Sequence, residues 1–219
     1  MNESIKPNSA LLVVDVQNDF CPGGALAVEE GDQVVPDLNR WIDRFAKDGR
    51  PIAYTRDWHP PGHCSFKEQG GPWPVHCVQR TRGADLHPGL KVKGPIFDKA
   101  FEPDKEAYSG FGGFLVDRKG KLTDLSLAEW LRRQDVKHVY VGGLTTDYCV
   151  RTTTLDALKE GFEVTVLGDA IRAVNVQPGD DRRAIAEMKE AGAEFVQSRS
   201  QKSGVRSQNQ KTEDSGVRR

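Results

Sequence analysis

Short apolar runs alternate with helical patterns along most of the chain. Four segments have the apolar spacing or the flanking signals of helices, and they cover residues 32–47, 125–134, 145–160 and 180–191. Between them lie runs with the length and composition of buried strands, at residues 10–16, 51–56, 95–99, 137–142, 162–167 and 194–196. This alternation predicts an α/β three-layer sandwich with a mostly parallel central sheet of about six strands and helices on both faces.

Local signals mark several of the expected helix ends. Gly49, Gly161 and Gly192 each follow a helical segment closely enough to end it, because glycine readily adopts the left-handed conformation after a last helical turn. At the start of the second helix, the side chain of Asp124 or Thr123 could accept a backbone N–H as the N-cap.

Two segments depart from the alternation. Residues 57–94 are rich in Pro, Gly, His and Trp and have no periodic element, and a loop of this length inside a compact domain is usually functional. Residues 198–219 are almost entirely polar or charged, so we expect a disordered tail there. The chain is therefore expected to comprise one folded domain, residues 1–197, and a C-terminal tail, residues 198–219.

Composition narrows the possible partners and the compartment. The 31 basic and 32 acidic residues give a net charge of −1, so there is no basic excess to recruit nucleic acid. No apolar run approaches the roughly 18 residues of a membrane span, and the polar N-terminus has neither a signal peptide nor a lipidation motif. We expect a cytoplasmic protein whose four cysteines are thiols rather than disulfides. The sequence carries no signal for an oligomeric state.

Three residues near the ends of strands or helices have candidate chemistry. Asp15 interrupts an aliphatic strand near its carboxyl end, where α/β sheets bind ligands, so it is either a catalytic base or a cap of the following turn. Cys149 lies near a predicted helix start, where the helix dipole lowers a thiol pKa and free N–H groups can hold an oxyanion; otherwise it is a small buried hydrophobic residue. Lys99 ends a strand and could stabilise a thiolate or carboxylate, although a solvated lysine is the simpler interpretation.

The long loop holds a cluster of metal-ligand side chains. Asp57 and His59 are two residues apart, on the same side of an extended segment, and His63 and His76 follow in the same loop. One carboxylate with two or three imidazoles suits Zn²⁺, Fe²⁺ or Mn²⁺. His87 also lies in this loop, but we interpret it as an ordinary polar group.

Aromatic residues lie next to these polar groups in the sequence. Phe20, Trp73 and Tyr108 could enclose a flat ring between them. No spacing rule selects these three from the other aromatic residues, so simple packing in the core is the alternative.

Taken together, these segments resemble the nicotinamidases, a group within the isochorismatase-like cysteine hydrolases. The resemblance covers about residues 10–196 and is carried by six motifs in a fixed order. They are residues 15–24 (DVQNDFCPGG), 55–63 (TRDWHPPGH), 73–78 (WPVHCV), 97–99 (FDK), 108–111 (YSGF) and 142–150 (GGLTTDYCV).

The resemblance implies a catalytic triad of Asp15, Lys99 and Cys149, with Cys149 as the nucleophile. It implies an oxyanion hole formed by the backbone N–H groups of Thr145 and Cys149, with a cis peptide bond between Leu144 and Thr145. Thr145 stands where alanine is common in the family, and the chain between Lys99 and the YSGF motif is slightly longer than in some relatives.

The resemblance also assigns the metal ligands and the substrate-binding residues. The metal ligands would be Asp57, His59 and His76, joined in some relatives by the position of His63. The substrate-binding residues would be Phe20, Trp73, Tyr108 and Leu144. One divalent ion is expected, with Zn²⁺ first and Fe²⁺ or Mn²⁺ as alternatives.

The implied activity is hydrolysis of nicotinamide to nicotinate and ammonia in NAD salvage, through a cysteine thioester, with the metal bound to the pyridine nitrogen. The main alternative is an amidase of the same superfamily that acts on another small amide or a carbamoyl compound, which the metal cluster disfavours. An isochorismatase is disfavoured because its vinyl-ether chemistry does not need Cys149. A non-enzymatic metal-binding protein would be expected to lack a member of the triad, and none is missing.

Overall fold

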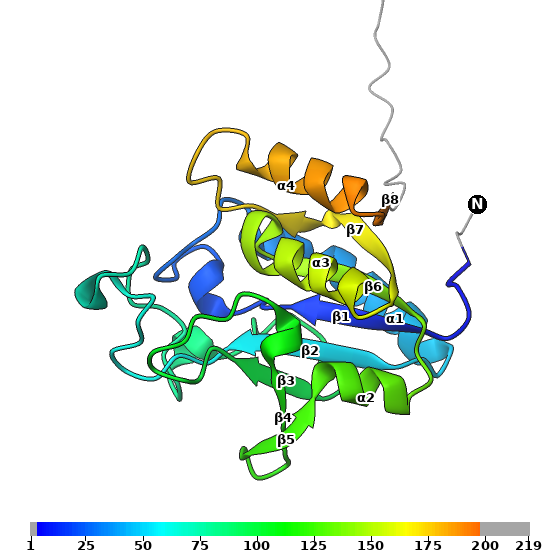
Figure 1. Cartoon of the computed structure of the whole chain (residues 1–219), viewed down its shortest axis with the longest axis horizontal. Helices are drawn as coiled ribbons and strands as arrows, with labels where there is room; N and C mark the ends of the chain where they lie inside the picture. Colours follow the sequence, from blue (N-terminus) through cyan, green and yellow to red (C-terminus); the bar gives the residue numbers. More distant parts are fainter. Residues whose placement is uncertain (1–3, 198–219) are drawn as a thin grey trace, which may run out of the picture.

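The computed structural model describes residues 4–197, and the expected tail, residues 198–219, lies outside the described residues. One sheet of eight strands in the order β5-β4-β3-β2-β1-β6-β7-β8 runs through the molecule (Figure 1). The strands are β1 (Ser9–Val14), β2 (Ile52–Asp57), β3 (Ile96–Lys99), β4 (Phe114–Val116), β5 (Leu122–Ser126), β6 (His138–Leu144), β7 (Glu163–Arg172) and β8 (Glu194–Val196). The helices are α1 (Val34–Lys47), α2 (Leu127–Arg133), α3 (Arg151–Lys159) and α4 (Asp180–Glu190).

The six strands predicted from apolar runs are all present, and they pair in parallel from β3 through to β8. The expected fold class is confirmed, but the sheet has two more strands than expected. These two, β4 and β5, form an antiparallel hairpin beside β3 at one edge of the sheet. Their side chains are mostly only half-buried, so they lack the continuous apolar run that reveals a strand covered on both faces.

The hairpin also changes the start of the next helix. Leu125 belongs to β5, and α2 begins only at Leu127. The side chain of Ser126 accepts the N–H of Glu129 and caps the helix, so the expected cap at Asp124 or Thr123 was wrong.

The two faces of the sheet are covered by different helices. Along β1, Leu11 and Val13 pack in a core that includes buried residues of α1, whereas Leu12 and Val14 pack in a second core with residues of α2, α3 and α4. Each fully buried aliphatic side chain of this kind stabilises the fold by about 1.5–3 kcal/mol. The view in Figure 1 accordingly shows α2 and α3 in front of the sheet and α1 behind it.

The helix ends agree with the glycine signals. After α3, Gly161 has a φ of +86°, and the N–H of Phe162 donates to the carbonyl of Ala157, so the last turn of the helix is closed by a left-handed residue. Gly49 and Gly192 also have positive φ and follow α1 and α4 in the same way. Within residues 4–197, no helix combines the length and the apolar character that crossing a membrane requires.

The carboxyl ends of four neighbouring strands meet at one edge of the molecule. Asp15 follows β1, Asp57 ends β2, Lys99 ends β3, and Thr145 follows β6. The register pairs Asp57 with Lys99 directly. The long loop after β2 lies beside this edge, on the left of Figure 1, so the sheet and the loop together form the site.

Candidate active site

Lys99 stands at the centre of a buried group of charged side chains. Its Nζ lies 3.0 Å from Asp15 Oδ2 and 3.6 Å from Cys149 Sγ, and it donates a short hydrogen bond to Asp57 Oδ1. The side chains of Asp15 and Lys99 are completely buried, and Cys149 is 4% exposed. The structure therefore brings the three predicted triad residues into contact, with Lys99 also touching the first residue of the predicted metal group.

The backbone holds Asp15 in an unusual conformation at the end of β1. Its φ is +48°, in the left-handed region that aspartate tolerates better than most residues. Its N–H donates to the carbonyl of Thr55 at 3.2 Å, and its Oδ1 accepts a hydrogen bond from the Thr55 hydroxyl at 2.6 Å. Thr55, in β2, thus fixes one carboxylate oxygen and leaves the other beside Lys99.

The turn that carries Cys149 follows β6 through a tightly packed glycine. Gly143 has a φ of +129°, and a Cβ at this position would lie 2.0 Å from the carbonyl oxygen of Val14. The peptide bond between Leu144 and Thr145 is cis, as expected. Cys149 then lies inside a π-helical turn, Thr146–Val150, that precedes α3, rather than near the start of one continuous α-helix over residues 145–160 as predicted.

Burial sets the protonation of the two residues that would exchange a proton. Desolvation raises the pKa of Asp15 to about 6, although Lys99 opposes the shift. Burial also raises the pKa of the Cys149 thiol well above its usual value, against the lowering effect of Lys99. The expectation of a depressed thiol pKa was therefore wrong, because desolvation outweighs the effect of the Lys99 ammonium. The pKa of Lys99 stays high because Asp15 and Asp57 outweigh its own burial.

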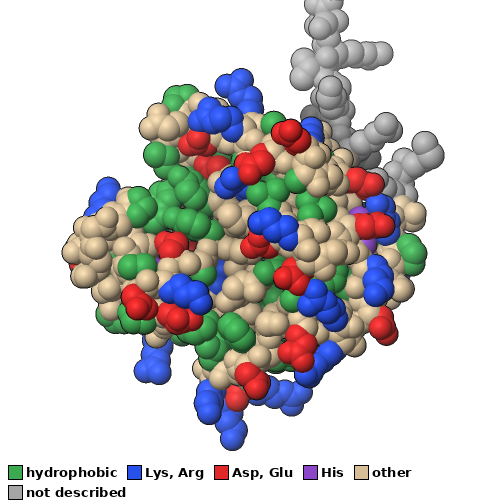
Figure 2. All heavy atoms as spheres, in the orientation of Figure 1, with side chains coloured by type: hydrophobic (Ala, Val, Ile, Leu, Met, Phe, Trp, Pro, Cys, Tyr) green, Lys and Arg blue, Asp and Glu red, His purple; other side chains and the backbone are tan. Residues whose placement is uncertain are grey.

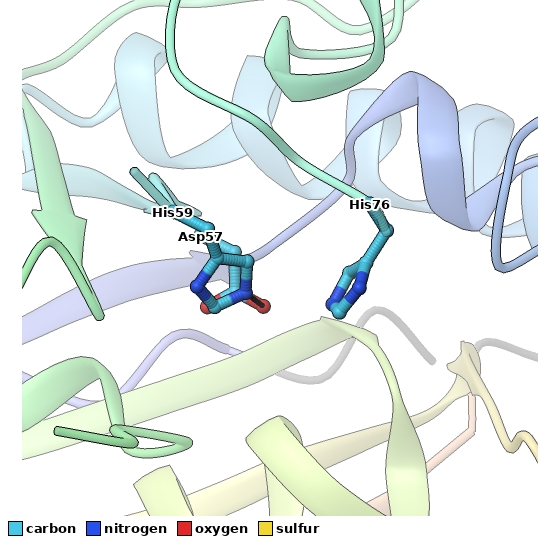
Figure 3. Close-up of side chains that lie close together, drawn as sticks. All are labelled: Asp57, His59 and His76. Atoms are coloured by element: carbon cyan, nitrogen blue, oxygen red, sulfur yellow. Dashed lines mark ion pairs between the residues drawn. The ribbon is translucent and has the colours of Figure 1, made fainter. Parts of the chain in front are cut away.

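Asp57, His59 and His76 form a second buried group. One ligand atom from each lies within 4.8 Å of the others, and Figure 3 shows His76 approaching Asp57 and His59 from a separate stretch of the loop. The Nδ1 atoms of the two histidines face backbone carbonyls, those of Ala100 at 3.2 Å and Pro74 at 2.8 Å. A carbonyl only accepts, so each Nδ1 carries the proton and each Nε2 keeps a lone pair for a metal.

The charge state of this group also suits a cation. Burial lowers the pKa of His59 to about 4, so its imidazole is neutral at physiological pH, the form that binds metals. The contact with Lys99 keeps the pKa of Asp57 below its usual range despite its burial. The carboxylate of Asp57 and the neutral imidazole of His59, with His76 beside them, therefore suit a divalent ion.

His63 lies beside the group but is not part of it. Its ring centroid is 4.2 Å from that of His59. Its Nδ1 contacts the hydroxyl of Ser65 at 2.7 Å, and its Nε2 contacts the carbonyl of Lys105 at 3.2 Å. Both ring nitrogens are engaged with the protein. His87 accepts the N–H of Gly89 within its own turn, as a loop polar group does.

A small pocket of about 280 Å³ connects the two groups. It is lined by Phe20, Leu26, Asp57, Trp73, His76, Tyr108, Thr145, Tyr148, Cys149 and Val174. Phe20, Trp73 and Tyr108, the three predicted ring-binding aromatics, thus all line this pocket. The indole N–H of Trp73 donates to the Tyr108 hydroxyl at 3.0 Å. Leu144, also predicted to bind substrate, is fully buried in the core and is not among these lining residues.

Several residues that line or support the site were not predicted from the sequence. Tyr148 and Val174 line the pocket, but only the position of Tyr148 beside Cys149 could have drawn attention to it. Gln17 exchanges two hydrogen bonds of 2.8 Å with the backbone N–H and carbonyl of Asp57. Asp19 accepts the N–H of Cys77 at 2.7 Å and so fixes the backbone next to His76.

The family model of the isochorismatase domain matches residues 9–200. The protein belongs to the isochorismatase family. Among members of this family, a nicotinamidase of Escherichia coli is 44% identical over 204 residues, which cover 85% of this chain and 93% of that protein.

Solved structures of isochorismatase-family relatives have the same fold and indicate which group within the family this chain resembles. A pyrazinamidase of Pyrococcus horikoshii, in complex with zinc, is 51% identical with a TM-score of 0.78, over 87% of this chain and 99% of that one. The PnC1 protein of L. infantum, in complex with nicotinate, is 34% identical with a TM-score of 0.74, over 87% and 92% of the two chains. Within the family, the chain falls in the nicotinamidase/pyrazinamidase group.

Proposed function

We propose that this protein hydrolyses nicotinamide to nicotinate and ammonia through a thioester at Cys149, a reaction of NAD salvage. The observation that supports the proposal is the pocket, because Cys149 of the buried Asp–Lys–Cys group lines the same small space as Asp57 and His76 of the buried metal-ligand group, together with aromatic side chains. A flat ring with a basic nitrogen at one end and a carboxamide at the other fits such a site. Relatives named nicotinamidase, and a related structure with nicotinate, support the assignment.

Asp57, His59 and His76 would hold a divalent ion, with Zn²⁺ as our first assignment and Fe²⁺ or Mn²⁺ as alternatives. Their buried donor atoms and the two Nε2 lone pairs fit such an ion, and His63 would be a fourth ligand only if its present contacts were exchanged. When bound, the ion would coordinate the pyridine nitrogen and fix the orientation of the ring.

The chemical steps fall to the triad. Asp15 accepts the thiol proton of Cys149 as the sulfur attacks the carboxamide carbon, since the raised pKa of the thiol keeps it protonated until then. Lys99 stabilises the carboxylate and the developing thiolate from 3.0 and 3.6 Å. The proton then passes from Asp15 to the leaving ammonia, and water hydrolyses the thioester to nicotinate.

The developing oxyanion would be held by the backbone N–H groups of Thr145 and Cys149. Both residues line the pocket, and the turn between them brings their backbones to the same wall. Loss of one such donor typically costs about 2.7–4 kcal/mol of transition-state stabilisation.

The test is release of ammonia and nicotinate from nicotinamide by the purified, metal-loaded protein. Benzamide is the matched control substrate, because it has the same shape without the ring nitrogen and should react far more slowly. An N-carbamoyl amino acid and isochorismate test the alternative activities. Faster ammonia release from the carbamoyl compound than from nicotinamide would overturn the proposed substrate.

A further inference from the structure

Asp147 is a buried carboxylate, two residues before the nucleophile, for which the proposed reaction has no step. It is 8% exposed and lies in the same π-helical turn as Cys149. Its two oxygens accept two backbone hydrogen bonds, from the N–H of Val174 at 3.0 Å and from the N–H of Asn175 at 2.8 Å. The carboxylate therefore ties the nucleophile's turn to a segment 27 residues further along the chain.

The segment that Asp147 holds forms part of the pocket wall. Val174 lines the pocket together with residues from several other parts of the chain, among them Phe20 and Cys149. Asn175 has a φ of +53°, and its side chain accepts the N–H of Asp181 at the start of α4. The segment thus connects β7 to α4, and the carboxylate of Asp147 joins it by hydrogen bonds to the turn that carries Cys149.

We propose that Asp147 is a positioning residue that fixes Val174 against the substrate ring and so sets how large a ring the pocket accepts. This inference rests on the proposed function, since it concerns selection among aromatic amides by the same site. The pocket is small, about 280 Å³ with its opening to solvent included, so an outward movement of one wall admits additional ring atoms. Because both carboxylate oxygens are used, the wall and the nucleophile's turn keep one fixed separation.

Asp147→Asn tests the idea with the same side-chain shape. An amide offers one oxygen to one N–H, but its NH₂ group faces the other N–H, so one of the two hydrogen bonds is lost and replaced by a repulsive contact. Two quantities are measured, the KM of nicotinamide and the inhibition constant of quinoline-3-carboxamide, which adds a fused ring to the same amide. We expect their ratio to shift about tenfold in favour of the larger ring, the scale of one hydrogen bond to a charged acceptor.

Asp117→Asn is the control for the chemical change at a site away from the pocket. Asp117 accepts two backbone hydrogen bonds at a single oxygen, Oδ1, from Lys119 at 2.8 Å and Lys121 at 2.9 Å, in the β4–β5 hairpin at the edge of the sheet. This variant should leave the ratio unchanged. If Asp147→Asn lowers kcat/KM without changing the ratio, the role of Asp147 is structural only and the inference is wrong.

Val174→Ala tests the wall directly and leaves the two backbone hydrogen bonds in place. It should shift the ratio in the same direction as Asp147→Asn, and an unchanged ratio in this variant would overturn the inference even if Asp147→Asn did not fold. Inactivity of the wild-type protein toward nicotinamide is a separate outcome, because it would reject the proposed function rather than the role of Asp147.

Discussion

The triad and the metal-ligand group share one pocket but are built in different ways. Asp15 and Lys99 stand at the ends of paired strands, where the register of the sheet fixes their backbones. His59 and His76 belong to the long loop, where single contacts fix the backbone instead. One of them is the hydrogen bond from the N–H of His59 to the carbonyl of Cys77. Asp57 belongs to both, because it ends β2 and contacts Lys99. The sheet thus positions the reacting groups, and the loop positions what orients the substrate.

Removing the nucleophile should have the largest effect, because it should abolish turnover without affecting the metal-ligand group. We expect Cys149→Ala to lower kcat by on the order of 10⁵-fold or more, as removal of a covalent nucleophile does. The bound metal, measured by elemental analysis, should stay at the wild-type level because the loop is untouched. Cys64→Ala, which removes a half-buried thiol outside the triad, serves as the control and should remain active. Normal ammonia release by Cys149→Ala would refute the thioester mechanism.

Disrupting the loop group should have the next largest effect and should leave the triad intact. We expect removal of metal by dipicolinate, or the His76→Ala substitution, to lower kcat/KM by roughly 100-fold or more, because a poorly positioned substrate loses about that much rate. Added Zn²⁺, Mn²⁺ or Fe²⁺ should restore the stripped wild-type protein but not His76→Ala. His87 lies outside the group, so His87→Ala is the control and should keep its activity. Full activity after complete removal of metal would contradict the proposed role of the loop.

The pH profile should show which region limits activity in acid. Asp15 must be ionised to accept the thiol proton, and its pKa is raised to about 6, so activity is present above that pH and lost as the pH falls through it. We expect kcat/KM to fall about tenfold per pH unit below 6. His59, whose pKa is about 4, would bind protons only at lower pH. A fall in kcat/KM that begins only near pH 4 would contradict this and would indicate that protonation of His59, in the loop, limits activity instead.

The smallest effect is expected at the aromatic wall. Trp73→Phe keeps an aromatic ring but removes the N–H that donates to the Tyr108 hydroxyl at 3.0 Å. We expect the KM of nicotinamide to rise about fivefold with kcat nearly unchanged, the scale of one neutral hydrogen bond. Trp130→Phe, on α2 and outside the pocket lining, should not alter KM. A fall in kcat alone would place Trp73 with the reacting groups.

The two regions also differ in how well the sequence predicted them. The six parallel strands were predictable because strands covered on both faces appear as continuous apolar runs, as β1 does with six buried residues. The hairpin of β4 and β5 was not, because its half-buried strands include polar positions such as Asp124. The position of Asp15 at the carboxyl end of its strand, where such sheets bind ligands, followed from the strand pattern alone. The burial of Lys99 beside it did not, because a solvated lysine was the simpler interpretation of the sequence.

The loop was predictable in chemistry but not in shape. Its histidines and Asp57 marked a metal site by residue type, yet their arrangement depends on long-range contacts, such as those of Gln17 with Asp57 and of Asp19 with Cys77. No local pattern contains such contacts. The protonation of Cys149 was misjudged for a related reason, because desolvation depends on everything packed around the thiol.

Gly143 limits how this site can evolve. Any side chain there would meet the carbonyl oxygen of Val14 at 2.0 Å, so a mutation at this position cannot be accepted without moving the strand that ends at Asp15. Val174, by contrast, lies on a connecting segment and is only half-buried, so it can be exchanged without rebuilding the sheet. Descendants of this protein can therefore acquire new substrates by changing the pocket wall, while the geometry of the attacking cysteine is inherited almost unaltered.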